Sequence, residues 1–314
     1  MPRRLRFVPL GSLIEVTGKT FQDRYLLKPS KELNRRVIGV FARAKVRYGV
    51  KVHALTVLSN HYHCLLSPVD ADRLAGFMNY VHSNVAHEVG RLHDWDGRFW
   101  KDRYKSIPVS DEEAAQVARL RYLLANGCKD GLVAKPGNWP GVHSADALTD
   151  NENLEGVWYD RTSLSRARAR GESVDETDFA TTLVLRLDPL PCWQERGLSR
   201  EARRQEVSAL IRSIVEDAAV ERRASGAQEP KPVRFDTIHP HQRAARSSRR
   251  HAPLVHAGSR EVRNALRLAY RSFVESFYSA KRRLDEEGAR VRFPEGSFPP
   301  SLPFVPYGLK PAPS

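Results

Sequence analysis

Short runs of alternating apolar and polar residues mark the strands expected in the first part of the chain. Residues 12–20, 50–58 and 61–68 are rich in β-branched residues or alternate in polarity, as strands with one buried face do. The pair Ser59–Asn60 between the last two runs suits a tight turn. These two runs therefore predict a β-hairpin.

Longer segments carry apolar residues three and four positions apart, which is the spacing of one helix face. Three such segments are residues 30–49, 70–93 and 110–127. Ser30 can cap the first of them and Gly49 can end it. A further strand is expected at the end of residues 99–109.

The predicted order is strand, helix, strand, strand, helix, strand, helix. An explicit hairpin within this order favours an α+β fold, with helices packed on an antiparallel sheet, over a doubly wound parallel sheet. The closest standard plan is the ferredoxin-like arrangement.

The pattern is weaker beyond residue 150. A long helix is expected over residues 199–224, and residues 225–258 are a basic linker rich in proline, serine and arginine. An amphipathic helix over residues 259–288 could dock on a polyanion or cover the first domain with its aromatic face, and we favour the second. We expect four parts, namely residues 1–148, an accessory region 149–224, the linker 225–258, and a helix with a proline-rich tail at 259–314; the C-terminal region is thus mainly helical.

The charge balance points to a polyanionic partner. The 314 residues include 51 Lys and Arg against 37 Asp and Glu, a net charge of +14, which suggests nucleic acid first and an acidic membrane surface second. The three cysteines, Cys64, Cys128 and Cys192, lack the spacing of a disulfide framework or a zinc site and indicate a reducing compartment. No apolar run approaches the roughly 20 residues of a membrane span, so a cytoplasmic protein is expected.

Two histidines stand in the second strand of the expected hairpin. Alternate residues of a strand share a face, so His61 and His63 point the same way and Tyr62 points the other way. Two imidazoles on one face can chelate a divalent metal, but they can also be ordinary hydrogen-bonded residues at a sheet edge.

The helix expected at 110–127 offers two further candidates. Tyr122 and Asn126 are four residues apart and lie on one helix face, offset from its apolar stripe. Taken alone, Tyr122 could be a packing residue and Asn126 a helix cap before Gly127. Together with His61 and His63, they form a coherent set of metal ligands and a phenol nucleophile.

Several motifs in this order resemble those of a known family. They are the segments MPRRLRF, YGVKVHALTVLSNHYHCLL, FWKDRYKS, RYLLANGCKDGLV and NWPGVHS. Over residues 1 to about 148, the chain resembles the single-tyrosine transposases of the HUH endonuclease superfamily, in particular the REP-associated tyrosine transposases. It departs from their pattern at Gly127, where proline is common, and around Lys129, where the expected basic residue is shifted.

The resemblance implies a function and a set of site residues. Tyr122 would cleave single-stranded DNA through a 5′-phosphotyrosine intermediate and rejoin it, on an HUH endonuclease fold in residues 1–148. His61, His63 and Asn126 would bind Mn²⁺ or Mg²⁺, and imidazole ligands favour manganese of the two. The partner would be single-stranded or hairpin DNA, handled by a monomer or homodimer associated with the nucleoid.

Two other functions stay open at this level. One is a domesticated DNA- or RNA-binding regulatory protein that has lost the chemistry, although the intact set of candidate residues favours the enzyme. The other is a phosphodiesterase that hydrolyses rather than rejoins, which would give Tyr122 no role.

Basic and aromatic residues alternate between positions 98 and 105, as in many segments that bind single strands. The candidate phosphate contacts are Arg98, Lys101, Arg103 and Lys105, and the candidate stacking residues are Trp100 and Tyr104. The alternative is that Phe99 and Trp100 belong to the core and the charges only solvate a loop.

Overall fold

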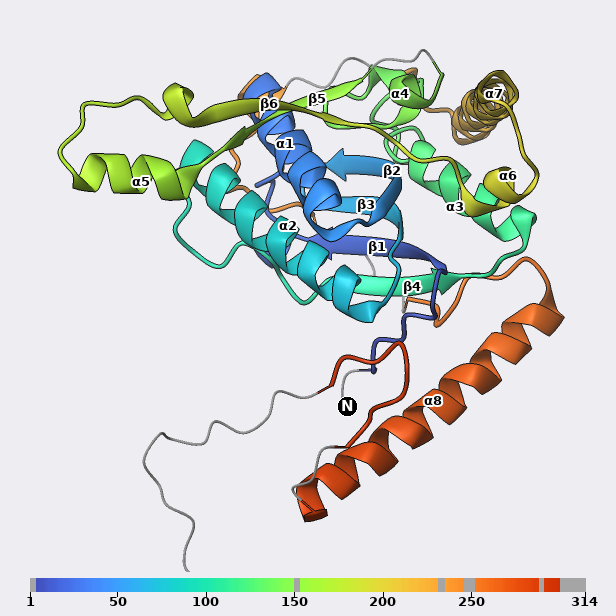
Figure 1. The fold of residues 1–314 in the computed structure, drawn as a ribbon. Coiled ribbons are helices and arrows are strands. Elements are labelled where there is room, and N and C mark those ends of the chain that lie inside the picture. The colour runs from blue at the N-terminus through green and yellow to red at the C-terminus, as the bar shows by residue number, and fades with distance from the viewer. Residues whose placement is uncertain (1–3, 150–152, 231–234, 246–251, 288–290, 300–314) are drawn as a thin grey trace, which may run out of the picture.

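The computed structural model describes residues 4–149, 153–230, 235–245, 252–287 and 291–299. Its centre is a four-stranded antiparallel sheet in the order β2-β3-β1-β4 (Figure 1). The strands are β1 (Leu13–Lys19), β2 (Lys51–Leu58), β3 (His61–Ser67) and β4 (Lys105–Val109). This is the ferredoxin-like order, and the expected α+β fold is confirmed.

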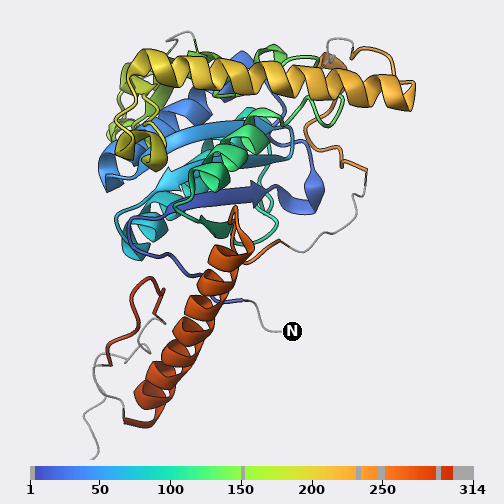
Figure 2. The same ribbon diagram turned by 90° about the vertical axis from the view of Figure 1, so that its right-hand side faces the viewer.

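Two helices cover one face of this sheet and a third covers the other (Figures 1 and 2). They are α1 (Lys31–Tyr48) and α2 (Ala71–Leu92) on the first face and α3 (Glu113–Leu124) on the second. Ser30 accepts a hydrogen bond from the Leu33 amide at the start of α1, and Gly49 ends that helix in the left-handed conformation, as predicted.

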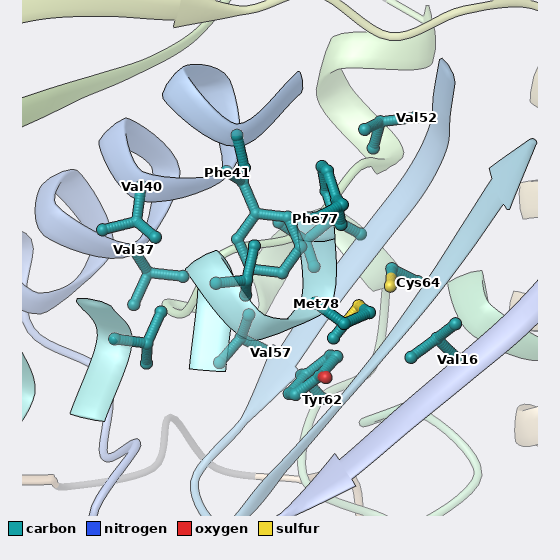
Figure 3. Packing of buried hydrophobic residues seen from close by; sticks show 14 of the residues in the cluster. Val16, Val37, Val40, Phe41, Val52, Val57, Tyr62, Cys64, Phe77 and Met78 are labelled. Carbon is teal, nitrogen blue, oxygen red and sulfur yellow. The ribbon is translucent and has the colours of Figure 1, made fainter. Parts of the chain in front are cut away.

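The larger core lies between the sheet and the pair α1 and α2. Val16, Tyr62 and Cys64 point into it from the strands and meet Phe41 and Phe77 from the helices (Figure 3). Because strand residues alternate between faces, the residues on either side of Tyr62 point toward α3 instead.

Residues 153–225 wrap around this domain. Their elements, preceded by α4 (Ala145–Thr149), are β5 (Leu154–Tyr159), α5 (Arg161–Ala169), β6 (Ala180–Leu185), α6 (Pro191–Glu195) and α7 (Arg200–Ser225). The strands β5 and β6 form an antiparallel pair that packs on α1, while α7 packs on α3 and α4 (Figure 2). Short 3-10 turns are formed by Phe21–Asp23, Pro136–Asn138, Glu176–Phe179 and Phe235–Thr237.

The last helix, α8 (Arg260–Glu287), projects away from the sheet (Figures 1 and 2). The sequence favours a helix that covers the first domain with its aromatic side, but in the structure this side does not lie over the sheet or over α1, α2 and α3 (Figures 1 and 2). Instead Phe273 packs against Phe7 of the N-terminal segment, with ring centroids 4.6 Å apart, and Phe277 packs against Phe293. The aromatic stripe is satisfied by chain segments close to both termini.

The division into four parts stays a prediction, and residues 300–314 of the proline-rich tail lie outside the described residues. None of the helices in the described part of the chain has the length and apolar character needed to span a bilayer.

Candidate active site

The paired histidines of β3 face α3. Their neighbours Tyr62 and Cys64 enter the core on the other side of the sheet, so the strand alternation places His61 and His63 on the α3 face. The two imidazole centroids are 5.3 Å apart. The sheet therefore presents two adjacent imidazoles to the helix that carries Tyr122.

His63 is held by the neighbouring strand β1. Its Nδ1 lies 3.1 Å from Glu15 Oε1 and 3.2 Å from Thr17 Oγ1. Burial would raise the pKa of Glu15, but hydrogen bonds from His256 and His63 outweigh it and hold the pKa well below its usual range. Because the ionised carboxylate can only accept, Nδ1 donates the proton, and Nε2 is the His63 nitrogen that can bind a ligand.

His61 adopts the same tautomer as His63, but with a different hydrogen-bond partner. Its Nδ1 lies 2.7 Å from Asn60 Oδ1, and an amide oxygen can only accept, so Nδ1 again donates. Burial lowers the pKa of His61 well below its ordinary value, and His63, Lys19 and Lys129 lower it further. At neutral pH, His61 is thus uncharged, which is the form that binds a metal.

Tyr122 lies beside this pair. Its ring meets the His63 imidazole edge-on, with centroids 5.6 Å apart and planes at 76°. Two cations contact the Tyr122 ring: the Arg119 guanidinium carbon is 4.5 Å from its centroid, and Lys129 Nζ is 3.9 Å from it. The Tyr122 ring is therefore adjacent to the His63 imidazole and to two positive charges that could meet an anionic substrate.

Asn126 follows one helical turn after Tyr122, just beyond the end of α3. Its exposed fraction is 0%, and neither Nδ2 nor Oδ1 has a hydrogen-bond partner in the described part of the molecule. A buried amide without partners is costly, so such a group calls for an explanation. A metal ligand is one, because coordination would satisfy the amide oxygen.

The donor set fits a divalent metal of intermediate hardness. Within the described ranges, no three His, Cys, Asp or Glu side chains gather in one place. A site here would therefore consist of the Nε2 atoms of His61 and His63 completed by the Asn126 oxygen. Nitrogen and neutral oxygen donors suit Mn²⁺ better than Mg²⁺, which prefers an all-oxygen shell.

The segment between positions 98 and 105 is partly occupied by internal contacts. Trp100 stacks on His82 with centroids 4.2 Å apart and donates its indole N–H to the His82 carbonyl. The Arg6 guanidinium covers the Tyr104 ring, and Lys101 pairs with Asp23 at 2.6 Å. Arg98 donates to the carbonyls of Trp100 and Lys101.

Three exposed cations of this segment form no ion pair among the described residues: Arg98, Arg103 and Lys105. Of these, Arg98 is already held by two backbone carbonyls. All six DNA contacts proposed for this segment stay predictions. The internal packing of Trp100 and Tyr104 makes Arg103 and Lys105 the stronger candidates.

Sequence reasoning did not find the residues behind His63. Glu15 and Arg119 lie in predicted elements, but only the pairing of β1 with β3 brings the carboxylate to the imidazole. His256 comes from a segment more than a hundred residues away. In the sequence, an acidic residue at an inward-facing position of a strand could have drawn attention to Glu15, but nothing comparable pointed to Arg119 or His256.

One family of known proteins matches part of the chain. Residues 22–123 match the family described as "Transposase IS200 like", a range that includes both histidines and Tyr122. No curated protein matches the chain significantly.

Nine solved chains are similar to this chain, and two of them illustrate the low level of identity. A REP-associated tyrosine transposase bound to a REP hairpin is 17% identical, with a TM-score of 0.39 over 56% of this chain and 90% of that chain. A candidate transposase from Deinococcus radiodurans is also 17% identical, with a TM-score of 0.28 over 38% of this chain and 95% of that chain.

Proposed function

We propose that this protein cleaves single-stranded DNA with Tyr122 as the nucleophile and rejoins the ends. The match of residues 22–123 to the IS200-like transposase family supports this proposal. The observation that carries the proposal is the position of Tyr122, whose ring lies 5.6 Å from that of His63 on the same face of the sheet. A tyrosine on the other face could not have met the paired imidazoles.

The phenol suits a reaction that must be reversible. The Tyr122 oxygen loses its proton and bonds to the scissile phosphorus, while the bond from phosphorus to the 3′ oxygen breaks. The products are a 5′-phosphotyrosine and a free 3′-hydroxyl. Attack by a 3′-hydroxyl on the aryl phosphate then re-forms the phosphodiester and releases Tyr122, so no outside energy source is needed.

His61, His63 and Asn126 would hold a divalent metal, with Mn²⁺ favoured by the donor atoms. When bound, such an ion polarises the scissile phosphate and offsets its negative charge. The ammonium of Lys129 lies 3.9 Å from the centre of the Tyr122 ring, so it would add a second positive charge near a phosphate attacked by Tyr122.

The substrate we propose is DNA that is single-stranded or that flanks a hairpin. A net charge of +14 supports a polyanionic partner. A nucleophile next to two bulky imidazoles and beneath two cationic side chains is accessible to a flexible single strand more readily than to a stiff duplex.

The test is a covalent-adduct assay with the full chain, Mn²⁺ and a hairpin oligonucleotide bearing single-stranded flanks. A 5′-phosphotyrosine attaches the protein to the fragment on the 3′ side of the break. A 3′ label should therefore migrate with the protein in a denaturing gel, while a 5′ label should appear in a free, shorter oligonucleotide.

Two tyrosine variants make a matched pair. Tyr122→Phe should lose the adduct and keep DNA binding, whereas Tyr159→Phe, which removes a phenol from β5 on the far side of α1, should leave the adduct unchanged. Binding without any adduct in the unaltered protein, with Mn²⁺ or Mg²⁺, would instead indicate a DNA-binding regulator. Cleavage that persists in Tyr122→Phe would indicate hydrolysis.

A further inference from the structure

A segment from the C-terminal region adds to the edge of the sheet. β4 is an edge strand, so one side of its backbone is open to pairing. The amide of His256 donates to the Pro108 carbonyl at 2.9 Å, and the Ser110 amide donates to the His256 carbonyl at 2.8 Å. We call residues 252–259 the return segment; it lies beside the end of β4 in Figure 1, directly before α8.

The position of the return segment is fixed a second time by Glu112. The carboxylate of Glu112 accepts hydrogen bonds from the amides of Gly258 and Ser259, at 2.8 and 3.0 Å. Two hydrogen bonds of the His256 backbone and two of the amides that follow it therefore hold the return segment in one place.

The His256 side chain reaches the residue that orients His63. Its Nε2 lies 2.9 Å from Glu15 Oε2, and the other oxygen of this carboxylate is 3.1 Å from His63 Nδ1. The Glu15 side chain is only 4% exposed, and Arg119 approaches Oε2 less closely, at 3.3 Å. His256, Glu15 and His63 thus form a hydrogen-bonded chain that ends at the candidate metal site.

Such a chain has a known physical consequence. A carboxylate that accepts from a ligating histidine fixes the tautomer and the direction of the ring, and loss of an outer partner typically weakens metal binding by about 10- to 100-fold. Without His256, the donor left to Oε2 among the described residues is Arg119, at the longer distance of 3.3 Å, so the carboxylate that orients His63 would be held less firmly.

We propose that His256 is a positioning residue for the metal site, and that docking of the return segment on β4 completes this site. The proposal rests on the proposed function, in that it takes His63 as a metal ligand. It assigns a role to the C-terminal region, since α8 begins at Arg260, directly after the return segment.

The test measures Mn²⁺ affinity by isothermal titration calorimetry on the full chain without DNA. We expect His256→Ala to weaken binding by about 10- to 100-fold. His256→Gln should recover most of the affinity, because its amide N–H can still donate to Glu15. His87→Ala, which removes an exposed histidine from α2, should bind as the unaltered protein does.

A double-mutant cycle shows whether His256 acts through the carboxylate. In a Glu15→Gln background, His256→Ala should cause little further loss of Mn²⁺ affinity, since the chain is already broken. Equal losses with and without Glu15 would overturn the proposal, as would an unchanged affinity in His256→Ala or a failure of His256→Gln to recover more affinity than His256→Ala.

The outcome is distinguishable from failure of the proposed function. If His61→Ala also leaves Mn²⁺ binding unchanged, the metal site itself is wrong. If His61→Ala abolishes binding and His256→Ala does not weaken it, the site stands and the positioning role of His256 is wrong. Circular dichroism and the unfolding midpoint of each variant verify that the fold is intact.

Discussion

At the scale of single residues, Asn126 is the clearest case of a side chain that lowers stability and is explained by a function. Its amide is completely buried and makes no hydrogen bond within the described residues. On folding, this amide loses its hydrogen bonds to water without gaining others, which lowers the free energy of unfolding. A group of this kind adds no stability to the metal-free protein. Its value lies in what it can bind.

We therefore expect Asn126→Leu to stabilise the metal-free protein. Leucine has a similar volume and no polar atoms to leave unpaired, so the free energy of unfolding should rise by about 1–2 kcal/mol. Urea unfolding in the presence of a chelator measures this change.

The same variant should lose the response to metal. Mn²⁺ should raise the unfolding midpoint of the unaltered protein through mass action and leave that of Asn126→Leu nearly unchanged. A variant that is less stable without metal, or that Mn²⁺ still stabilises fully, would argue against Asn126 as a ligand.

The sequence could predict the residues that lie in one element or share a periodicity. His61 and His63 follow from the two-residue repeat of a strand, and Tyr122 and Asn126 from the spacing of a helix. Glu15 and His256 could not be predicted in the same way, because the register between strands and the return of a distant segment depend on the packing of the whole domain.

At the scale of elements, the backbone of β5 lies unusually close to the backbone of α1. A Cβ added to Gly39 would lie 2.1 Å from the Val157 carbonyl oxygen, and one added to Gly156 would lie 2.1 Å from the Gly39 nitrogen. Two glycines in register thus let a strand lie directly on a helix.

Gly39→Ala should therefore destabilise the protein, although alanine is the better helix former. Overpacking of this kind typically costs about 1–3 kcal/mol, and the clash here is with backbone that cannot rotate away. Gly76→Ala on α2 is the matched control, because its Cβ would meet only the end of the Tyr48 side chain, which can move. Chemical unfolding should show a large loss for Gly39→Ala and little change for Gly76→Ala; equal effects would refute the packing argument.

Ion pairs join α1 and α5 to α2. Glu88 is buried and binds both Arg36 of α1 and Arg161 of α5, at 2.8 and 2.6 Å. Burial would raise the pKa of Glu88, but hydrogen bonds from Arg161 and Arg36 hold it below its usual value of 4.5. The stabilisation is therefore fully present above about pH 4.5 and is lost as the pH falls through the lower pKa of the folded state.

Glu88→Gln should remove this contribution. At pH 7 we expect a loss of about 3 kcal/mol, since two arginines lose the more buried of the two carboxylates that they share, the other being Glu176. The difference from the unaltered protein should shrink as the pH falls below about 4.5. Glu172→Gln, which breaks an exposed pair with Arg170, should have little effect at any pH. A difference that stays constant down to pH 3 would contradict the assignment.

These contacts explain which elements the sequence predicted. The ends of α1 are encoded locally by Ser30 and Gly49, and the central strands by their own alternation. By contrast, α3 begins at Glu113 rather than at 110, and β5 and α5 were not predicted at all. Their stability comes from Gly39, Arg36 and Glu88, which are distant in the chain and give no local pattern.

At the scale of the whole molecule, segments near both ends of the chain, residues 5–8 and 293–296, pack close to α8 or to each other. Phe7 packs on Phe273, the Tyr270 hydroxyl donates to the Leu5 carbonyl at 3.2 Å, and the Val8 amide donates to the Gly296 carbonyl at 3.1 Å. The N-terminal segment therefore connects α8 to β1 on one side, while the return segment connects it to β4 on the other. Both attachments lead into the sheet that carries the candidate site.

The net charge of +14 acts over the same scale, but only some of the cations are free to meet DNA. Lys101 is paired with Asp23, whereas Arg103 and Lys105 are exposed and form no ion pair among the described residues. Each phosphate contact on a single strand contributes about 0.7 to the slope of log affinity against log salt concentration. An exposed cation should thus contribute to this slope, and one already paired should not.

We expect the double variant Arg103→Ala/Lys105→Ala to bind single-stranded DNA more weakly and to reduce the magnitude of the slope by up to about 1.4. Lys101→Ala is the matched control: it also removes a positive charge from this segment, but it should leave the slope nearly unchanged. Fluorescence anisotropy with a labelled single strand, at roughly 50 to 300 mM salt, measures the affinity and its dependence on salt. If the control lowered the slope as much as the double variant does, the effect would come from total charge, and this segment would not be a DNA contact.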